Sequence, residues 1–218
     1  MSNTGGGRRL RVDPGRRSSA AGAGSCGDTP AETPEIEDSP GGLRVEVSNR
    51  QRKVPVDGRQ VGRLLRLLLG EALGLKRAHL SVCLLDDAAM ARLNETYVHH
   101  EGPTDVITFD YREGGPPIGR DDLWGEICVG VEEAQRQARR YGTRWPAEVA
   151  RYLVHGVLHL LGYDDQRPAA RLRMKREEDR LLRQLRRRFA WENLRRGAGR
   201  TRRTAPRGAR NGRPGSGL

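Results

Sequence analysis

The sequence predicts an α+β fold: a small mixed sheet of about four strands, covered by helices mostly on one face. Two observations lead to this expectation. Apolar residues alternate with polar ones in some segments and recur every three or four residues in others, without a strict alternation of strand and helix. Gly, Pro and Ser accumulate at both ends of the chain, where large apolar residues are scarce. We therefore predict one domain over residues 43–188, between disordered tails at 1–42 and 189–218.

Four segments are predicted to be strands. Residues 43–48 (LRVEVS) alternate between apolar and polar, as in a half-buried strand. Residues 79–85 are mostly apolar and are expected to form a central strand. A β-branched run at 106–109 and the segment 124–130 are the other two, separated by a Gly- and Pro-rich loop at 114–117.

The first two predicted helices follow aspartates that can cap them. After Asp57, apolar residues from Val61 to Leu73 recur at three and four residue spacing, which indicates an amphipathic helix. Asp86 or Asp87 can cap the second helix. Its apolar side carries Met90, Leu93 and Tyr97.

Three more helices are expected in the C-terminal half. Residues 132–141 have Glu in the first turn and Arg in the last, as the helix dipole favours, and Gly142 ends this helix. Pro146 opens the next one at a first-turn position. Its apolar face consists of Val149, Leu153, Val154, Val157, Leu158 and Leu161. A strongly charged helix over about 168–188 completes the domain.

The charge of the chain is distributed unevenly. Its 218 residues include 40 Lys and Arg against 28 Asp and Glu, a net charge of +12. Residues 186–218 carry +10 of this and residues 1–42 carry −1, which leaves +3 for residues 43–185. A polyanion, such as a nucleic acid or an acidic membrane surface, is therefore a more natural partner than an acidic protein.

The cysteines and the apolar runs indicate the compartment. Cys26, Cys83 and Cys128 are too few and too dispersed for a disulfide framework, and the last two lie in apolar runs typical of buried thiols. We find neither the apolar region of a signal peptide nor an apolar run of about 20 residues. The expectation is a soluble cytoplasmic protein without membrane attachment.

The segment HGVLHLLGYDD (155–165) carries the pattern H-x3-H-x2-G-x2-D. On a helix, His155 and His159 lie one turn apart and about 40° apart around the axis, so both imidazoles can reach one metal ion. Gly162 can stop the helix and turn the chain, which brings Asp164 or Asp165 back toward the histidines. Three protein ligands with an open position are typical of catalytic zinc. The alternative is a histidine pair that is only packed and hydrogen-bonded.

Gly156 disfavours one class of metalloenzyme. Peptidases with an H-E-x-x-H motif place a general-base glutamate directly after the first histidine, where this chain has glycine.

Three blocks of the sequence resemble the YbeY family of bacterial metal-dependent endoribonucleases. HGVLHLLGYDD resembles the family signature H-G-x-x-H-x-x-G-Y-D-H. LNETYVHHEGPTDVITF (93–109) and WGEICVGVEEAQRQARRYG (124–142) resemble two further blocks, in the family's order. The resemblance covers most of residues 43–165 and does not include the tails.

The resemblance implies an α+β fold and one zinc ion per chain, bound by three histidines. It also implies single-strand-specific endoribonuclease activity in 16S rRNA 3′ end maturation and ribosome quality control, with ribosomal RNA and the ribosome as partners. On this chain the metal ligands correspond to His155, His159 and Asp165. Thr104 and Asp105 are expected near the site by the family pattern, with Asp105 as a catalytic residue.

Asp164 is the second candidate catalytic residue. It is interpreted either as a carboxylate that orients a ligand or the water, or as a turn residue bonded to its own backbone.

Two positions depart from the family pattern. Asp165 stands where the family has its third histidine. An Asp can ligate zinc, and a set of two histidines and one carboxylate also suits iron or manganese. Val98 stands where many members have an arginine thought to contact RNA. His99 and His100 are candidates to replace it, although exposed loop histidines are more often merely solvated.

The Arg-rich C-terminal segment is predicted to bind RNA, because arginines separated by small residues can follow a phosphate backbone. The alternative is a solubilising tail in a chain with 37 Arg and 3 Lys. The predicted RNA-binding residues are Arg195, Arg196, Arg200, Arg202 and Arg203. A second functional hypothesis is a non-catalytic ribosome-assembly or RNA-binding factor that retains the fold. The oligomeric state is left open.

Overall fold

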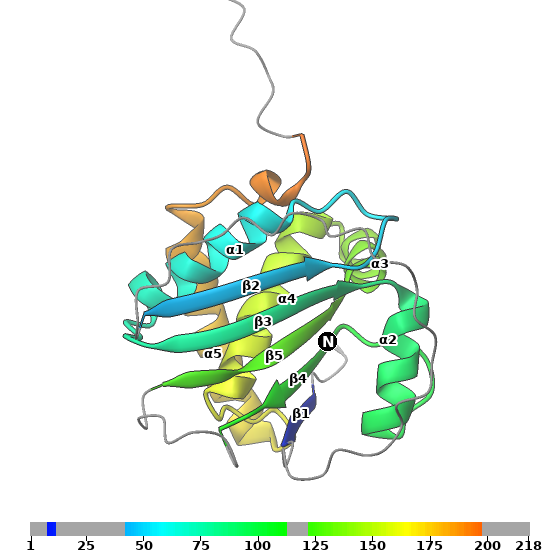
Figure 1. Ribbon diagram of the computed structural model, residues 1–218, viewed down its shortest axis with the longest axis horizontal. Coiled ribbons are helices and arrows are strands. Elements are labelled where there is room, and N and C mark those ends of the chain that lie inside the picture. Colours follow the sequence, from blue (N-terminus) through cyan, green and yellow to red (C-terminus); the bar gives the residue numbers. More distant parts are fainter. Residues whose placement is uncertain (1–7, 12–41, 113–121, 198–218) are drawn as a thin grey trace, which may run out of the picture.

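The computed structural model describes residues 8–11, 42–112 and 122–197, which form a five-stranded sheet covered by helices (Figure 1). The strands are β1 (Arg8–Arg11), β2 (Leu43–Asn49), β3 (Ala78–Leu85), β4 (Val106–Asp110) and β5 (Leu123–Gly130), in the spatial order β1-β4-β5-β3-β2. The α+β class and all four predicted strands are confirmed. The predicted loop at 114–117 and most of the predicted N-terminal tail lie outside the described residues.

The sheet is mixed. β2, β3 and β5 run parallel to one another, β4 is antiparallel to β5, and β1 pairs in parallel with β4. The strand β1 was not predicted, because its sequence RRLR shows neither an apolar run nor an alternating pattern. It lies within the segment expected to be a disordered tail.

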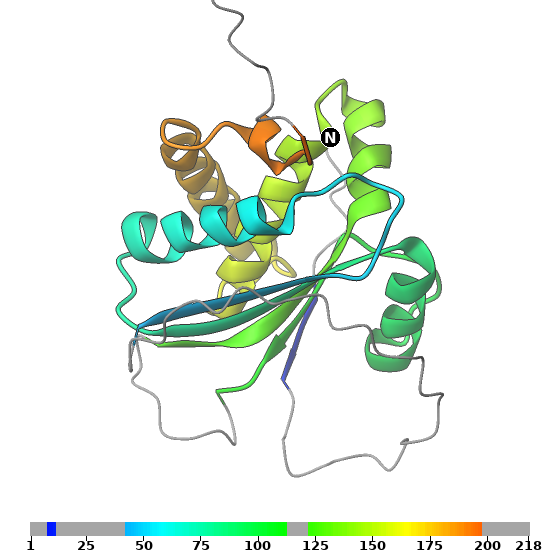
Figure 2. The same cartoon turned by 45° about the horizontal axis from the view of Figure 1, so that its top comes forward.

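Three helices cover one face of the sheet: α1 (Gly58–Arg66), α4 (Trp145–Leu160) and α5 (Pro168–Arg186) (Figure 2). Helix α4 contacts β4, β5, α3 (Val131–Tyr141) and α5, and is buried on nearly all sides. Gly156 permits its close approach to β5, because a Cβ there would lie 2.9 Å from a methyl carbon of Ile127. The histidine-bearing helix is thus held at the centre of the main core.

Side-chain caps begin the first two helices as the sequence predicts. Asp57 accepts hydrogen bonds from the backbone N–H of Arg59 and Gln60 at the start of α1, which continues as a π-helical segment, η1 (Leu67–Ala72). Of the two candidate caps for α2 (Asp87–Leu93), Asp86 is the one used, and it accepts from the N–H of Ala89. A second π-helical segment, η2 (Asn94–Val98), follows α2.

The opposite face of the sheet carries a smaller apolar cluster that packs against α2 and η2. Cys83 and Cys128 belong to this cluster, side by side in register on β3 and β5, and both are buried as expected.

Within the part of the chain that the structure describes, no helix has both the length and the apolar character needed to cross a membrane.

The folded domain extends beyond the predicted boundary at residue 188. The side chain of Phe189 is buried in the main core, and so is Leu194 of η3 (Trp191–Leu194). The backbone of Arg195 forms a bridge with Val56 near the start of α1. The prediction was wrong here because two isolated apolar residues in an Arg-rich segment do not produce a periodic pattern.

Candidate metal centre

The last turns of α4 place the two histidines together, as the spacing predicts. The ring centroids of His155 and His159 are 4.6 Å apart, and their Nε2 atoms face each other at 3.1 Å. His159 is almost fully buried, and His155 is partly exposed at the surface of the helix layer. Two imidazole nitrogens therefore converge on one point.

A glycine turn returns the chain to these histidines. Gly162 has a φ of 95°, and hydrogen bonds from Gly162 N–H to His159 O and from Tyr163 N–H to Leu158 O end the helix. The turn brings an Asp165 carboxylate oxygen to 3.9 Å from His155 Nε2. Ligand atoms of His155, His159 and Asp165 all lie within 4.8 Å of one another.

The donor set fits a divalent transition metal. Two nitrogens bound to one tetrahedral ion at about 2.0–2.1 Å lie about 3.3 Å apart, close to the separation of the two Nε2 atoms. The shorter Asp side chain reaches the cluster because the turn after Gly162 is tight. Two imidazoles and one carboxylate are ligands that zinc, iron and manganese accept.

The remaining ring nitrogens of both histidines have acceptors that set their orientation. His159 Nδ1 lies 3.1 Å from the backbone oxygen of Tyr163, and His155 Nδ1 lies 3.1 Å from a carboxylate oxygen of Glu178 on α5. Each Nδ1–H can therefore donate, which leaves the Nε2 lone pairs for a metal. The hydrogen-bond partners therefore favour the Nδ1-protonated tautomer of each histidine.

Glu178 was missed by the sequence analysis. It is 4% exposed, and its other carboxylate oxygen accepts from Arg151 at 2.7 Å and Lys175 at 3.0 Å. Burial alone would raise the pKa of Glu178, but the hydrogen bond with His155 and the charge of Lys175 outweigh burial and lower it to about 2. One signal in the sequence was available: Glu178 shares helical spacing with the apolar residues Met174 and Leu181, so it falls on the buried face of α5.

Asp105 lies where the polypeptide enters β4, and its carboxyl is within electrostatic range of His155. It is 6% exposed, and its Oδ1 accepts hydrogen bonds from Thr104 Oγ1 at 3.1 Å and Val106 N–H at 2.9 Å. Burial raises the pKa of Asp105 to about 6, against the opposing effect of His155. This predicted residue therefore lies within electrostatic range of His155 and outside the ligand cluster.

Asp164 has the contacts of a turn residue. Its Oδ1 accepts from the N–H of Gln166 at 2.9 Å, and its other oxygen lies 3.8 Å from the Arg167 guanidinium. The metal-ligand cluster contains its neighbour Asp165 and not Asp164. Of the two interpretations of Asp164, these contacts match the backbone-bonded turn.

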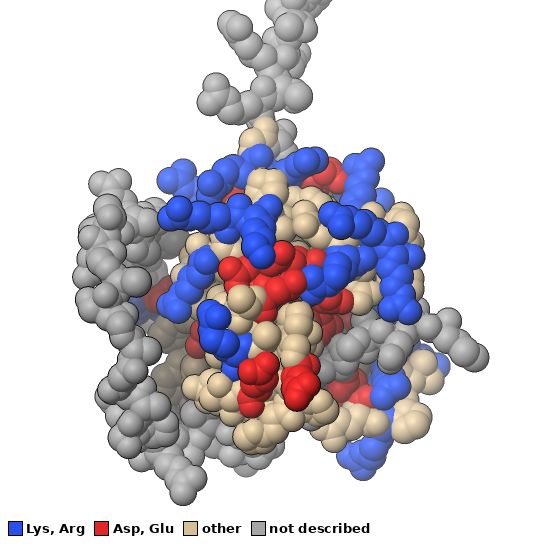
Figure 3. Space-filling view, turned by 90° about the vertical axis from the view of Figure 1, so that its right-hand side faces the viewer, with Lys and Arg blue, Asp and Glu red and all other residues tan. Residues whose placement is uncertain are grey.

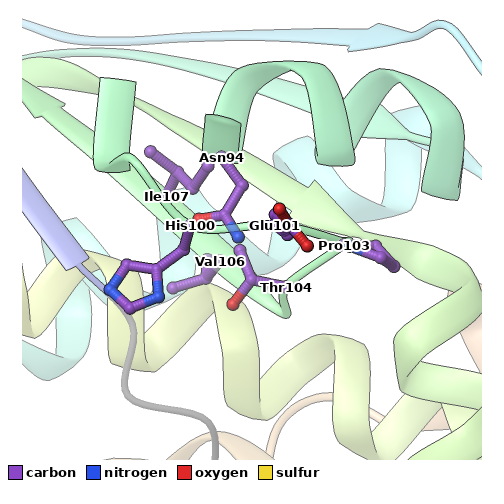
Figure 4. A pocket seen from close by; sticks show the side chains of 7 residues that line it. All are labelled: Asn94, His100, Glu101, Pro103, Thr104, Val106 and Ile107. Carbon is purple, nitrogen blue, oxygen red and sulfur yellow. The ribbon is translucent and has the colours of Figure 1, made fainter. Parts of the chain in front are cut away.

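A cavity of about 200 Å³ lies at the entrance to β4 (Figure 4). Val98, at the position where many family members have arginine, is buried in the smaller apolar cluster. His99 adopts a left-handed conformation, with φ of 58°, that ends η2 and turns the chain. His100 follows this turn and lines the cavity together with Thr104.

The described part of the Arg-rich segment begins far from the metal cluster. Arg195 and Arg196 are exposed, and Glu192 just before them pairs with Arg144, the residue that precedes α4. His159 follows Arg144 by fifteen residues, which is about 22 Å along the helix. Arg200, Arg202 and Arg203 lie outside the described residues.

Charges of both signs are interspersed on the side of the domain shown in Figure 3, where acidic side chains lie between basic ones. Around α2 and α3, Lys53 pairs with Glu132, and Arg136 pairs with both Asp87 and Glu133. Because these basic side chains are already paired with carboxylates, this surface is a poor candidate for a continuous phosphate-binding track.

An α+β domain with two histidines and a carboxylate at the end of its central helix has the composition of a catalytic metal centre with an open position. The fold and these three side chains therefore define the class as an α+β protein with a candidate metal centre. A family model described as Endoribonuclease YbeY matches residues 46–186, and the chain belongs to this family.

Two relatives that carry the same name are consistent with this assignment. Proteins named Endoribonuclease YbeY from Pelotomaculum thermopropionicum and Moorella thermoacetica are 40% and 36% identical over 146 and 149 residues. Each alignment covers 64% of this chain, and 95% and 96% of the respective relative. A solution structure of a Thermotoga maritima protein is similar at 22% identity with a TM-score of 0.46, covering 66% of this chain and 88% of the other.

Proposed function

We propose that this protein is a metal-dependent endoribonuclease that hydrolyses phosphodiester bonds in single-stranded RNA. The observation that carries the proposal is the convergence of His155 Nε2, His159 Nε2 and the Asp165 carboxylate within 4.8 Å. Both Nδ1 atoms are held by acceptors, as in metal-binding histidines generally. The relatives that carry the name Endoribonuclease YbeY support RNA as the substrate.

The proposed chemistry divides between the metal and the protein. A divalent metal in such a site supplies a water of lowered pKa and a Lewis acid for a phosphoryl oxygen. His155, His159 and Asp165 would hold it, with zinc as the proposed ion and iron or manganese as alternatives that the carboxylate ligand allows. Asp105, with a pKa of about 6, is proposed to accept a proton from the attacking water, because a carboxyl titrating near neutrality suits general-base chemistry.

Two arginines at the start of α5 are proposed to hold the substrate. Arg167 precedes the first turn of the helix, and Arg171 lies four residues, about 6 Å, further along it. The Arg171 guanidinium donates to the backbone oxygen of Asp165, so this pair of cations lies next to a proposed metal ligand. Helix α5 then leads toward the predicted RNA-binding arginines, from Arg195 onward.

The biological role that we propose is 16S rRNA 3′ end maturation and ribosome quality control in the cytoplasm, with the ribosome as partner. This role rests on family membership and on the proposed RNA chemistry.

The test is cleavage of single-stranded RNA containing a 16S rRNA 3′ precursor sequence by purified protein and by His159→Ala. We expect cleavage by the wild-type protein and its loss in the variant. Equal cleavage by both proteins would refute the proposed site.

A second candidate is a non-catalytic RNA-binding assembly factor, which the replacement of the family's third histidine by Asp165 favours. Elemental analysis of the wild-type protein and Asp165→Ala separates the two candidates. One tightly held metal ion per chain, lost in the variant, supports the enzyme. An RNA-binding protein that holds no metal supports the assembly factor.

A further inference from the structure

We infer that Glu178 on α5 is a positioning residue for the metal centre: it holds the proton of His155 on Nδ1 and so aims the Nε2 lone pair at the metal. This inference rests on the proposed function, because it assigns a role to a residue that supports the proposed ligands. Glu178 itself lies outside the ligand cluster.

The contact has the geometry of a hydrogen bond that selects a tautomer. His155 Nδ1 lies 3.1 Å from Glu178 Oε2, and the carboxylate is almost fully buried. An ionised carboxylate only accepts hydrogen bonds, so the nitrogen that faces it must carry the proton. In neutral imidazole the other nitrogen, Nε2, then has the free lone pair, and it lies 3.1 Å from His159 Nε2.

The two oxygens of Glu178 have separate partners. Oε1 accepts from Arg151 on α4 and from Lys175 on α5, and Oε2 faces His155. The two cations compensate the buried negative charge, which would otherwise be costly to maintain away from water. A carboxylate that served only to join α4 to α5 would need the Arg151 pair alone, whereas here its second oxygen is directed at a ligand.

The two ligand histidines are oriented by different kinds of acceptor. The acceptor for His159 is the backbone oxygen of Tyr163, which any residue would supply at that position. The acceptor for His155 is a side chain that only Glu178 provides. The orientation of His155 can therefore be altered by substitution without changing a ligand.

The experiment compares wild-type protein with Glu178→Gln, Glu178→Ala and the matched control Glu177→Gln. Glu177 is the preceding residue of the same helix, and it pairs with Arg180 away from the cluster. Gln retains an oxygen that can accept from Nδ1–H and nearly the same volume, whereas Ala removes the acceptor. Zinc affinity is measured by competition with a chromophoric chelator, and folding by thermal unfolding of the metal-free proteins.

We expect the control to bind zinc as tightly as wild type, and Glu178→Ala to lose about 10–100-fold in affinity. Glu178→Gln should lose less. Nitrogen-15 NMR of the histidines in metal-free protein at pH 8 gives a second readout, independent of metal. The His155 signal, assigned by its loss in His155→Gln, should report a proton on Nδ1 in wild type and a shifted tautomer population in Glu178→Ala.

The outcomes separate this inference from the proposed function. If wild-type protein binds zinc and both Glu178 variants bind it equally well, the positioning role is wrong and the metal centre stands. An Nε2-protonated His155 in the wild-type metal-free protein also overturns the role. A folded wild-type protein that binds no zinc, iron or manganese refutes the metal centre and the role together. If Glu178→Ala does not fold, Glu178→Met takes its place, because Met also removes the acceptor and keeps more of the side-chain volume. Weaker zinc binding by this variant supports the inference, and unchanged binding overturns it.

Discussion

Replacing Asp105 by Asn should stabilise the metal-free protein at neutral pH. The same substitution should abolish RNA cleavage by the metal-loaded protein. The pKa of this buried carboxyl is raised from 3.8 to about 6. A difference of about two pH units corresponds to about 3 kcal/mol. The protonated form is favoured in the folded state, so its stabilising contribution is complete below about pH 4 and is lost as the pH rises through about 6. Asn remains neutral and retains an oxygen that can accept from Thr104 and Val106.

The assay is urea unfolding of wild-type protein and Asp105→Asn at pH 4.5, 6 and 8, with chelator present. Chelation matters because a bound cation near Asp105 would favour the ionised form. The free energy of unfolding of the variant, relative to wild type, should increase by about 2 kcal/mol between pH 4.5 and pH 8, because part of the full effect lies below pH 4.5. A difference that stays constant across this range, or grows toward low pH, would show that burial does not raise the pKa of Asp105.

Three further variants test the packing of the core and the proposed contact with RNA. Gly156→Ala should lower the free energy of unfolding, measured by chemical denaturation, by about 1–3 kcal/mol, because the added Cβ overlaps the Ile127 side chain of β5. Unchanged stability would mean that α4 can shift away from the sheet. Phe189→Ala should lower the free energy of unfolding by about 3–5 kcal/mol, because the ring is buried in the main core although it follows the predicted domain boundary at residue 188. A loss below about 0.5 kcal/mol, as is usual for a surface residue, would contradict this. Replacing Arg167 and Arg171 together by Gln should lower the magnitude of the slope of log affinity for single-stranded RNA against log salt by about 1.4. An unchanged slope would exclude these two arginines from the RNA contact.

The sequence was sufficient for the part of the site that is local. His155, His159 and Asp165 are separated by one helical turn and one glycine turn, so helix geometry and the conformational freedom of Gly162 determine their approach. The choice between Asp164 and Asp165 needed the structure. Neighbouring residues in a turn point in different directions, and the backbone conformation decides which carboxylate faces the histidines.

The rest of the site depends on long-range contacts. Glu178 follows His155 by 23 residues, and Asp105 precedes it by 50. Glu178 reaches His155 because α5 packs on α4. Asp105 comes within electrostatic range of His155 because β4 packs against the same helix α4. No pattern of spacing within a single sequence predicts such contacts.

Local periodicity and turn chemistry alone determined the α+β class, four strands, the helices and the histidine pair, because each follows from interactions within a few residues. Tertiary structure decided the order of the strands, the addition of β1, and the packing of Phe189 and Leu194 into the core. It also decided the burial that raises the pKa of Asp105 and the partners that lower the pKa of Glu178. Those features arise where segments distant in sequence exclude water from one another. The desolvation of a carboxyl and the partner that compensates it are therefore properties of the packed domain.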